Sequence, residues 1–113
     1  MPVEKWSDSV VVARLADNPN VGDDLEALDS AMQQRRLDAV VDFSGVRMLN
    51  STSLAKLIKI RRQMTAADSR LILVGVNDNV WGAFLVTNLD KLFDFMDDVP
   101  TALAALQIKE RHV

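Results

Sequence analysis

The sequence contains no cysteine, and this absence removes several kinds of site at once. Disulfide bonds, thiol nucleophiles and metal sites built from thiolates are all excluded. Histidine is almost as scarce, because the single His112 lies next to the last of the 113 residues. Such a position is poor for a general base, since the ends of a chain are seldom held in place. These absences argue against an enzyme that depends on a thiolate or an imidazole.

Long apolar runs are also missing. No stretch approaches the roughly 18 consecutive apolar residues of a membrane-spanning helix, and the first residues lack the apolar core of a signal peptide. The formal net charge is −3, and aromatic residues make up only 5% of the chain. A slightly acidic chain has no overall attraction to nucleic acid or to an anionic membrane. We therefore expect a cytoplasmic protein that binds neither a membrane nor, directly, nucleic acid.

The composition is that of an ordinary globular domain. Hydrophobic residues account for 49% of the chain and charged residues for 26%. The length fits one domain with a single packed core, and no repeat, low-complexity segment or linker divides the sequence. We expect residues 1–113 to form a single domain.

Short runs of apolar and β-branched residues, separated by turn-forming residues, predict the strands. The run Leu71 to Val76 is the clearest of these, and its continuous apolar character predicts a strand buried on both faces. The predicted strands are Val3 to Trp6, Val10 to Leu15, Ala39 to Phe43, Leu71 to Val76 and Leu92 to Met96.

Apolar residues at helical spacing predict the helices. In the first, Val21, Leu25 and Leu28 recur on one face, and acidic residues occupy the first turn, as the helix dipole favours. The predicted helices begin at Val21, run from Ser53 to Met64, run from about Asn77 to Thr87, and begin between Asp97 and Thr101. The order ββαβαβαβα is typical of an α/β fold with a mixed sheet of four to five strands and about four helices.

The small polar residues Asn50 to Ser53 stand between an apolar run and a basic, helix-like run. Each carries a side-chain oxygen that can accept a hydrogen bond from the unpaired N–H groups of a helix start. A helix start also carries partial positive charge, which favours an anion or a phosphorylated hydroxyl. Two interpretations stay open from the residues alone: a series of helix caps with no other role, or a regulatory turn.

The basic residues Lys56, Lys59 and Arg62 recur three residues apart, so they share one drifting face of the predicted helix. This face is either a solvated surface or a docking surface for an acidic partner. In both cases we expect the side chains to point to solvent, so that their removal barely changes stability.

The other polar and aromatic clusters are better explained by a role in the fold than by binding of a metal or ligand. The pairs Asp23-Asp24 and Asp97-Asp98 could suggest a metal site, but both lie at predicted helix starts, where carboxylates are favoured. Trp81 and its apolar neighbours are expected in packing, and no glycine-rich phosphate loop is present. We expect no catalytic residues, no metal and no cofactor.

At this point the arrangement resembles the STAS domains, and especially the single-domain anti-sigma-factor antagonists of bacteria. The resemblance covers most of the chain and rests on these segments: Val40 to Val46, Leu49 to Leu54, Leu71 to Val76, Asn88 to Phe93 and Val99 to Leu103. The family's central pattern is Asp-Ser-Ser-Gly-Leu, in which a partner that is both kinase and anti-sigma factor phosphorylates the first serine. The residue at that position is Ser51, which the resemblance implies to be the phosphoacceptor.

The chain departs from the family pattern around this serine. Asn50 replaces the aspartate, Thr52 the second serine and Ser53 the glycine. The loss of the aspartate removes a negative charge beside the hydroxyl. After the second predicted strand, Asp17 to Asn20 occupies the place where the family commonly has Gly-Glu-Leu-Asp.

The resemblance implies a non-catalytic regulator of transcription that binds a kinase-type anti-sigma factor, releases a sigma factor, and is switched off by phosphorylation. The implied partner-binding residues are Asn50, Thr52, Ser53, Lys56, Lys59 and Arg62. One alternative is a STAS scaffold that does not switch and assembles with larger partners or as a homo-oligomer. A small-molecule-binding STAS domain would need an apolar pocket that the sequence does not display, and an enzyme is the least favoured class.

Overall fold

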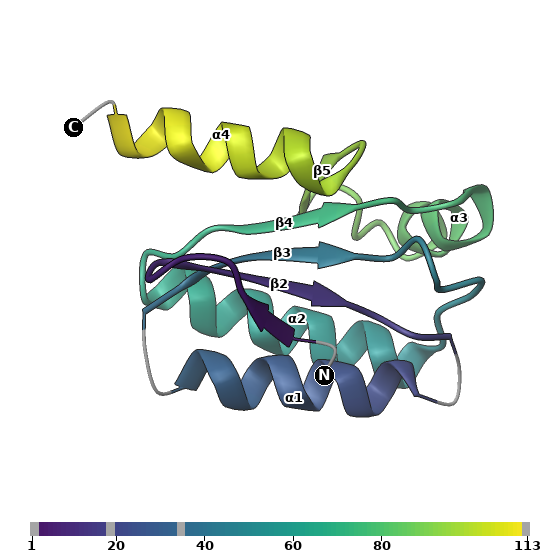
Figure 1. The fold of residues 1–113 in the computed structure, drawn as a ribbon. Helices are drawn as coiled ribbons and strands as arrows, with labels where there is room; N and C mark the ends of the chain where they lie inside the picture. Colours follow the sequence, from purple (N-terminus) through teal and green to yellow (C-terminus); the bar gives the residue numbers. More distant parts are fainter. Residues whose placement is uncertain (1–2, 18–19, 34–35, 112–113) are drawn as a thin grey trace.

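The computed structural model describes residues 3–17, 20–33 and 36–111, so His112 lies outside the described part. A five-stranded sheet with the order β1-β2-β3-β4-β5 forms its frame (Figure 1). The strands are β1 (Val3–Lys5), β2 (Val10–Arg14), β3 (Asp38–Asp42), β4 (Leu71–Val74) and β5 (Asp94–Met96). Only β1 pairs antiparallel with its neighbour, and the other pairs are parallel. The sheet is therefore mixed, as predicted.

The helices cover both faces of this sheet. They are α1 (Val21–Gln33), α2 (Ser51–Ala66), α3 (Asp78–Val86) and α4 (Val99–Arg111). Figure 1 shows α1 and α2 side by side under one face and α4 across the other, with α3 beyond the ends of the strands. The order ββαβαβαβα is confirmed. None of the helices in the described part is long and apolar enough to cross a membrane.

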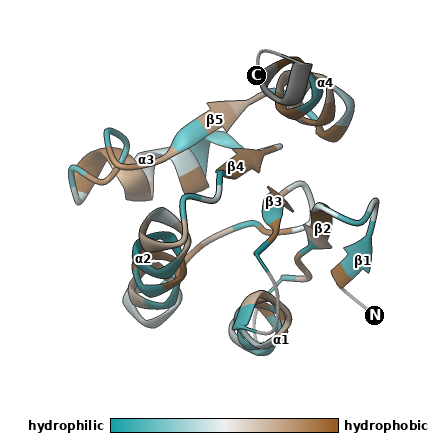
Figure 2. Cartoon of the chain, turned by 90° about the vertical axis from the view of Figure 1, so that its left-hand side faces the viewer, coloured by the Kyte–Doolittle hydropathy of each residue, from teal (hydrophilic) through white to brown (hydrophobic). Residues whose placement is uncertain are grey.

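Two apolar layers follow from the alternation of side chains along the central strands. Val41 and Leu73 point into the main core beneath α1 and α2, whereas Val40 and Ile72 point to a smaller core. The smaller core is closed by α4 through residues that include Leu106. Figure 2 shows β3 and β4 between α4 on one side and α1 and α2 on the other. The prediction that the strand beginning at Leu71 is buried on both faces is confirmed.

Aromatic side chains join α3 to the sheet. Phe84 packs edge to face against Phe43, Phe93 and Phe95, with ring centroids 5.1–6.5 Å apart. Trp81 makes the same kind of contact with Phe95 at 5.0 Å. Such pairs contribute about 0.5–1.5 kcal/mol beyond their buried area. The prediction that Trp81 and Phe84 serve in packing is confirmed.

The strand β4 ends two residues earlier than predicted, and Gly75 explains why. Gly75 has a φ of +71°, a conformation that side chains rarely permit. A Cβ atom there would also lie 2.9 Å from Oδ1 of Asp42. The chain therefore turns at Gly75 and directs the next residues toward the loop that precedes α2.

The predicted strand from Leu92 to Met96 is also shorter than expected. The backbone N–H of Leu92 donates to the carbonyl of Leu89 at 3.0 Å, so this segment is a turn, and pairing with β4 begins only at Asp94. Residues 88–93 therefore form a compact connection rather than strand.

Candidate functional site

The helix α2 (Ser51–Ala66) begins two residues before the predicted start at Ser53 and ends two residues after Met64. Asn50 has an extended backbone, and its Oδ1 accepts a hydrogen bond from the backbone N–H of Ser53 at 2.8 Å. The carbonyl of Asn50 also accepts from Leu54, which closes the first turn. Asn50 is thus the N-cap, and a capping contact of this type stabilises a helix by about 1 kcal/mol.

The side chains of this turn fall into two groups. Asn50, Ser51 and Thr52 are exposed, whereas Ser53 is only 2% exposed. Ser53 lies on the same helical stripe as the buried Leu57, so helical periodicity already places it toward the core. The expectation that Ser53 contacts a partner therefore needs correction, because its side chain is not presented at the surface.

The hydroxyl of Ser51 lies at the first position of a 16-residue helix, beside N–H groups that have no partner within the helix. Partial positive charge at this end of α2 favours a negative group there. The surface can therefore accommodate a phosphate at Ser51 without unfavourable charge from its own helix.

A carboxylate from another loop holds the segment before α2. Asp17 accepts two hydrogen bonds from Arg47, one from the backbone N–H at 3.1 Å and one from Nε at 2.7 Å. This side-chain hydrogen bond, together with the negative charge of Asp17, raises the pKa of Arg47 above its ordinary value. The loop that leads to Ser51 therefore carries the positive charge of Arg47 next to the negative charge of Asp17.

The cap of α3 holds the same segment from the other side. Asn77 caps α3 by accepting from Val80 through Oδ1, at 2.8 Å. Its Nδ2 donates to the carbonyl of Val46 at 3.0 Å. Together, Asp17 and Asn77 fix the loop before Ser51 to two neighbouring loops. The sequence placed Asp17 after a predicted strand and Asn77 at the start of a predicted helix, but it predicted neither of these contacts.

A shallow cavity of about 450 Å³ opens beside this loop, lined by Asp17, Arg47, Met48 and Asn79. Met48 is one of the exposed large hydrophobic residues. The surface next to Ser51 therefore combines a charged group and an apolar side chain, a mixture that protein interfaces commonly use.

The structure corrects the expected orientation of two basic residues on α2. Nζ of Lys56 lies 3.2 Å from Oε1 of Glu26, and Nζ of Lys59 lies 3.5 Å from Oδ2 of Asp29. Both side chains are therefore directed to α1 rather than only to solvent. Arg62 is exposed, and it forms no ion pair among the described residues. Partner binding by these three residues stays a prediction.

The pair between Lys59 and Asp29 predicts a stability effect. The Asp29 side chain is only 10% exposed, and its Oδ1 has no hydrogen-bond partner within the described part of the chain. Lys59→Glu would leave this carboxylate without its cation and add a like charge. We expect a loss of about 1–2 kcal/mol in the free energy of unfolding, measured by urea denaturation.

The matched control for Lys59→Glu is Arg62→Glu, which reverses a charge on the same helix. Because Arg62 is exposed and forms no ion pair among the described residues, the free energy of unfolding should change by no more than about 0.5 kcal/mol. Equal effects of the two variants would show that the contact with Asp29 contributes nothing to stability.

The paired aspartates hold local structure. Asp98 accepts hydrogen bonds from the side chain and backbone of Thr101, and these hold the pKa of its carboxyl below the ordinary value. Asp24 accepts from the backbone N–H of Ala16 at 2.7 Å. Among the described residues, no group of three or more acidic, histidine or cysteine side chains could hold a metal ion.

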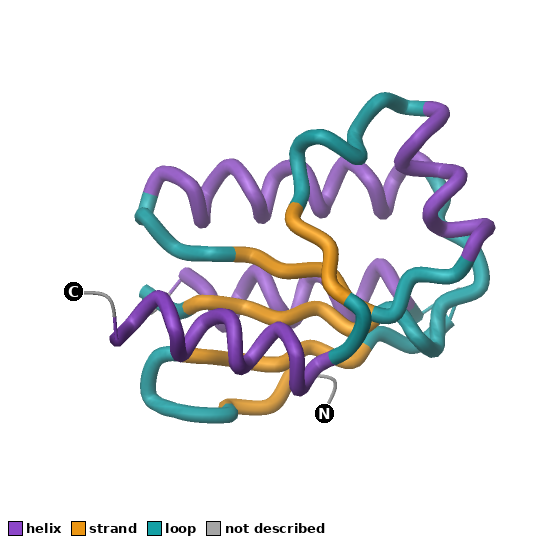
Figure 3. The backbone as a smooth tube through the Cα atoms, turned by 90° about the horizontal axis from the view of Figure 1, so that it is seen from above, coloured by secondary structure: helices purple, strands orange, loops and turns teal. Residues whose placement is uncertain are grey.

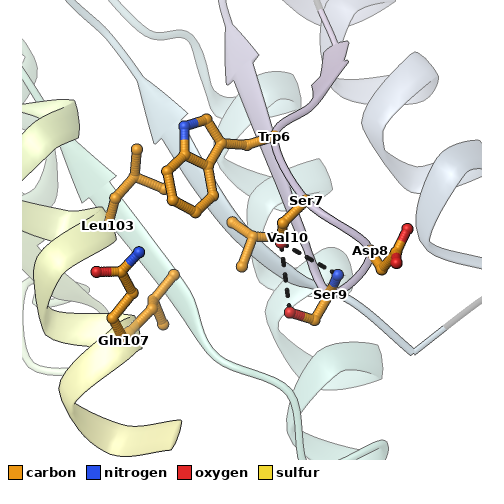
Figure 4. Close-up of a pocket in the computed structure, with 8 residues that line it drawn as sticks. Trp6, Ser7, Asp8, Ser9, Val10, Leu103 and Gln107 are labelled. Atoms are coloured by element: carbon orange, nitrogen blue, oxygen red, sulfur yellow. Dashed lines mark hydrogen bonds between the residues drawn. The ribbon is translucent and has the colours of Figure 1, made fainter.

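The side chain of Trp6 lies at the end of β1 and faces α4. Figure 4 shows its indole near Leu103 and Val10, at a cavity of about 330 Å³ that Gln107 also lines. Trp6 is nevertheless 47% exposed. Homo-oligomer formation, which the scaffold alternative includes, stays a prediction.

Comparison with known protein families gives one match over most of the sequence. A family model described as "Mlab, STAS domain" matches residues 11–96. No protein with a curated description matches the chain at a significant level.

Solved structures with the same fold include anti-sigma-factor antagonists. The anti-sigma factor antagonist SpoIIAA in its unphosphorylated form aligns with a TM-score of 0.79 and 18% identity, covering 93% of this chain and 94% of that chain. The Bacillus cell fate determinant SpoIIAA in its phosphorylated form gives 0.71 and 19%, covering 92% and 96%. An anti-sigma-factor antagonist (STAS) domain protein from Planctomyces limnophilus gives 0.77 and 18%, covering 87% and 91%. At these identities the likeness establishes the fold alone.

Proposed function

The chain belongs to the STAS domain family, and on this premise we propose that it is a non-catalytic antagonist of an anti-sigma factor. The observation that carries the proposal is the exposed hydroxyl of Ser51 at the start of α2, in a fold shared with solved antagonists. We further propose that residues 1–113 act as one domain and that the partner is a kinase-type anti-sigma factor.

In the unmodified state, the partner would bind the exposed part of the turn and the surface beside it. Asn50 and Thr52 flank Ser51 and are exposed, and Arg47 and Met48 extend this surface away from the helix. The hydrogen bonds of Arg47 to Asp17 reduce the freedom of this loop before binding. Less conformational entropy is then lost when a complex forms.

Phosphorylation at Ser51 would act locally. The phosphate adds about −1.5 to −2 charges at the surface that the partner contacts. Because the N-terminus of α2 favours a negative group, the domain should stay folded while the interface loses its complementarity. The switch would thus need no change of fold.

Capture of the partner from the native cell tests the proposal. The full chain, used as bait, should retain a small ATP-binding kinase that mass spectrometry identifies. The Ser51→Asp bait should retain much less of it, since the added charge imitates the modified state. Recovery of only STAS-containing complexes with both baits would contradict the proposal and favour a scaffold that does not switch.

A further inference from the structure

Three basic side chains gather at a cavity near the end of α2 that lies far from Ser51. Arg61, Arg70 and Lys91 line a space of about 260 Å³ together with the hydroxyl-bearing Thr65 and Ser69. They come from the second half of α2, the connection before β4 and the turn before β5. Figure 3 shows the turn before β5 crossing over α2, and Arg61 of α2 donates a hydrogen bond to the carbonyl of Leu92 in that turn.

These cations are distinguished by the lack of an acidic partner. The ion pairs of the described residues engage Lys5, Arg14, Arg36, Arg47, Lys56 and Lys59. Of the basic side chains that the structure describes, this leaves Arg61, Arg62, Arg70 and Lys91 unpaired, and all except Arg62 line the cavity. Like charges repel, so their convergence lowers stability unless a negative group offsets them.

Contacts within the chain position the guanidinium of Arg61 and the backbone at Arg70. Nε of Arg61 donates a hydrogen bond to the backbone carbonyl of Leu92, which directs the guanidinium toward the turn before β5. The backbone N–H of Arg70 donates to Oδ1 of Asp38 at 2.8 Å, which fixes the start of β4. Arg61 and Arg70 are also half-buried, so their side chains are less free than those of surface residues.

One carboxylate also lines the cavity, that of Asp94 at the start of β5. With three cations against one anion, the lining still has an excess of positive charge. Arginine forks bind phosphate oxygens through paired hydrogen bonds, and the hydroxyls of Thr65 and Ser69 add further donors. The volume lies just below the roughly 300–1,000 Å³ typical of pockets for drug-sized ligands, which suits a smaller group.

We propose that this cavity binds a small polyvalent anion of the phosphate class. A phosphate group would interact with all three cations at once, whereas a monovalent carboxylate would leave part of their positive charge uncompensated. The site is separate from the proposed switch, because Ser51 begins α2 and Arg61 lies in its second half. The phosphate could belong to a water-soluble ester or to a lipid headgroup, and both present the same chemistry to the cavity.

Titration of the ¹⁵N-labelled full chain with pyrophosphate, in a buffer without phosphate, tests the proposal. Saturable shifts should be confined to backbone amides around the cavity, such as those of Thr65, Ser69 and Lys91. The double variant Arg70→Gln/Lys91→Gln should bind at least about tenfold more weakly, since two charge-assisted contacts are lost. We leave Arg61 unchanged because it also holds the turn at Leu92.

Two further variants distinguish specific binding of pyrophosphate at the cavity from a general attraction of the anion to basic residues. Arg62→Gln removes a charge from the same helix outside the cavity, so affinity should change by less than about twofold. Asp94→Asn removes the only carboxylate among the lining residues, so pyrophosphate should bind more tightly. Weakening by Arg62→Gln to the same extent as by the double variant would overturn the proposal.

The source of the phosphate is tested with vesicles of phosphatidylcholine containing phosphatidic acid. Co-sedimentation that depends on Arg70 and Lys91 would identify a lipid headgroup, and saturable binding of pyrophosphate alone would identify a soluble phosphate compound. If the chain neither co-sediments with these vesicles nor binds pyrophosphate saturably, the proposal is overturned.

Discussion

A Leu73→Asp variant is expected to lose cooperative unfolding. Leu73 is 0% exposed in β4, and its side chain belongs to the main core. An isolated aspartate there costs several kcal/mol, whether it stays charged or takes up a proton. Because the free energy of unfolding of a domain is only about 5–15 kcal/mol, this single change removes much of it. Val41→Asp in β3 should have the same effect.

The control for this variant is Val86→Asp, which introduces the same charge at a position that is 88% exposed on α3. Its free energy of unfolding should stay within about 0.5 kcal/mol of the unmodified chain. Circular dichroism during heating and during urea denaturation measures both variants. A sharp transition of Leu73→Asp near the midpoint of the unmodified chain would refute the assignment of β4 as a buried strand.

The Ser51→Asp variant is expected to bind the captured anti-sigma factor at least about tenfold more weakly, a loss near 1.4 kcal/mol. The added carboxylate places charge at the centre of the proposed interface, where it has no counterpart on a surface that fits the neutral hydroxyl. Its melting temperature should be unchanged, because acidic residues are favoured in the first turn of a helix. Ser51→Ala should bind normally and resist inactivation by the kinase.

Ser30→Asp provides the matched control for Ser51→Asp. Ser30 is exposed on α1, so the variant adds the same charge to a neighbouring helix away from the turn. Calorimetric titration should give it the affinity of the unmodified chain. Equal weakening by Ser30→Asp and Ser51→Asp would mean that overall charge, rather than the turn, controls binding. Unchanged affinity of Ser51→Asp would favour the scaffold.

The fold could be predicted because its determinants are local in sequence. The apolar runs at Val40-Val41 and Leu71 to Val74 identify strands buried on both faces, and the cap-forming residues Asn50 to Ser53 mark the region where α2 begins. These signals act over a few residues, through alternation, helical period and capping. The ends of β4 and β5 were less predictable, because the turn at Gly75 and the turn at Leu92 depend on contacts with other segments.

The surroundings of the candidate site could not be predicted in the same way. Lys59 is paired with Asp29, 30 residues away, and Arg47 is paired with Asp17, also 30 residues away. Which acidic group a basic residue meets depends on how two helices or two loops lie side by side, and helical period says nothing about that. The burial of Ser53, by contrast, follows from its spacing to Leu57 and could have been found from the sequence.

The most direct test of the account compares the unmodified chain with the same chain phosphorylated at Ser51. The affinity of each for the captured anti-sigma factor is measured by calorimetry, and the melting temperature of each by circular dichroism. We expect at least about a tenfold loss of affinity with an unchanged melting temperature, because the phosphate lies at a helix start that favours it. Equal affinities of the two forms would contradict a switch at Ser51.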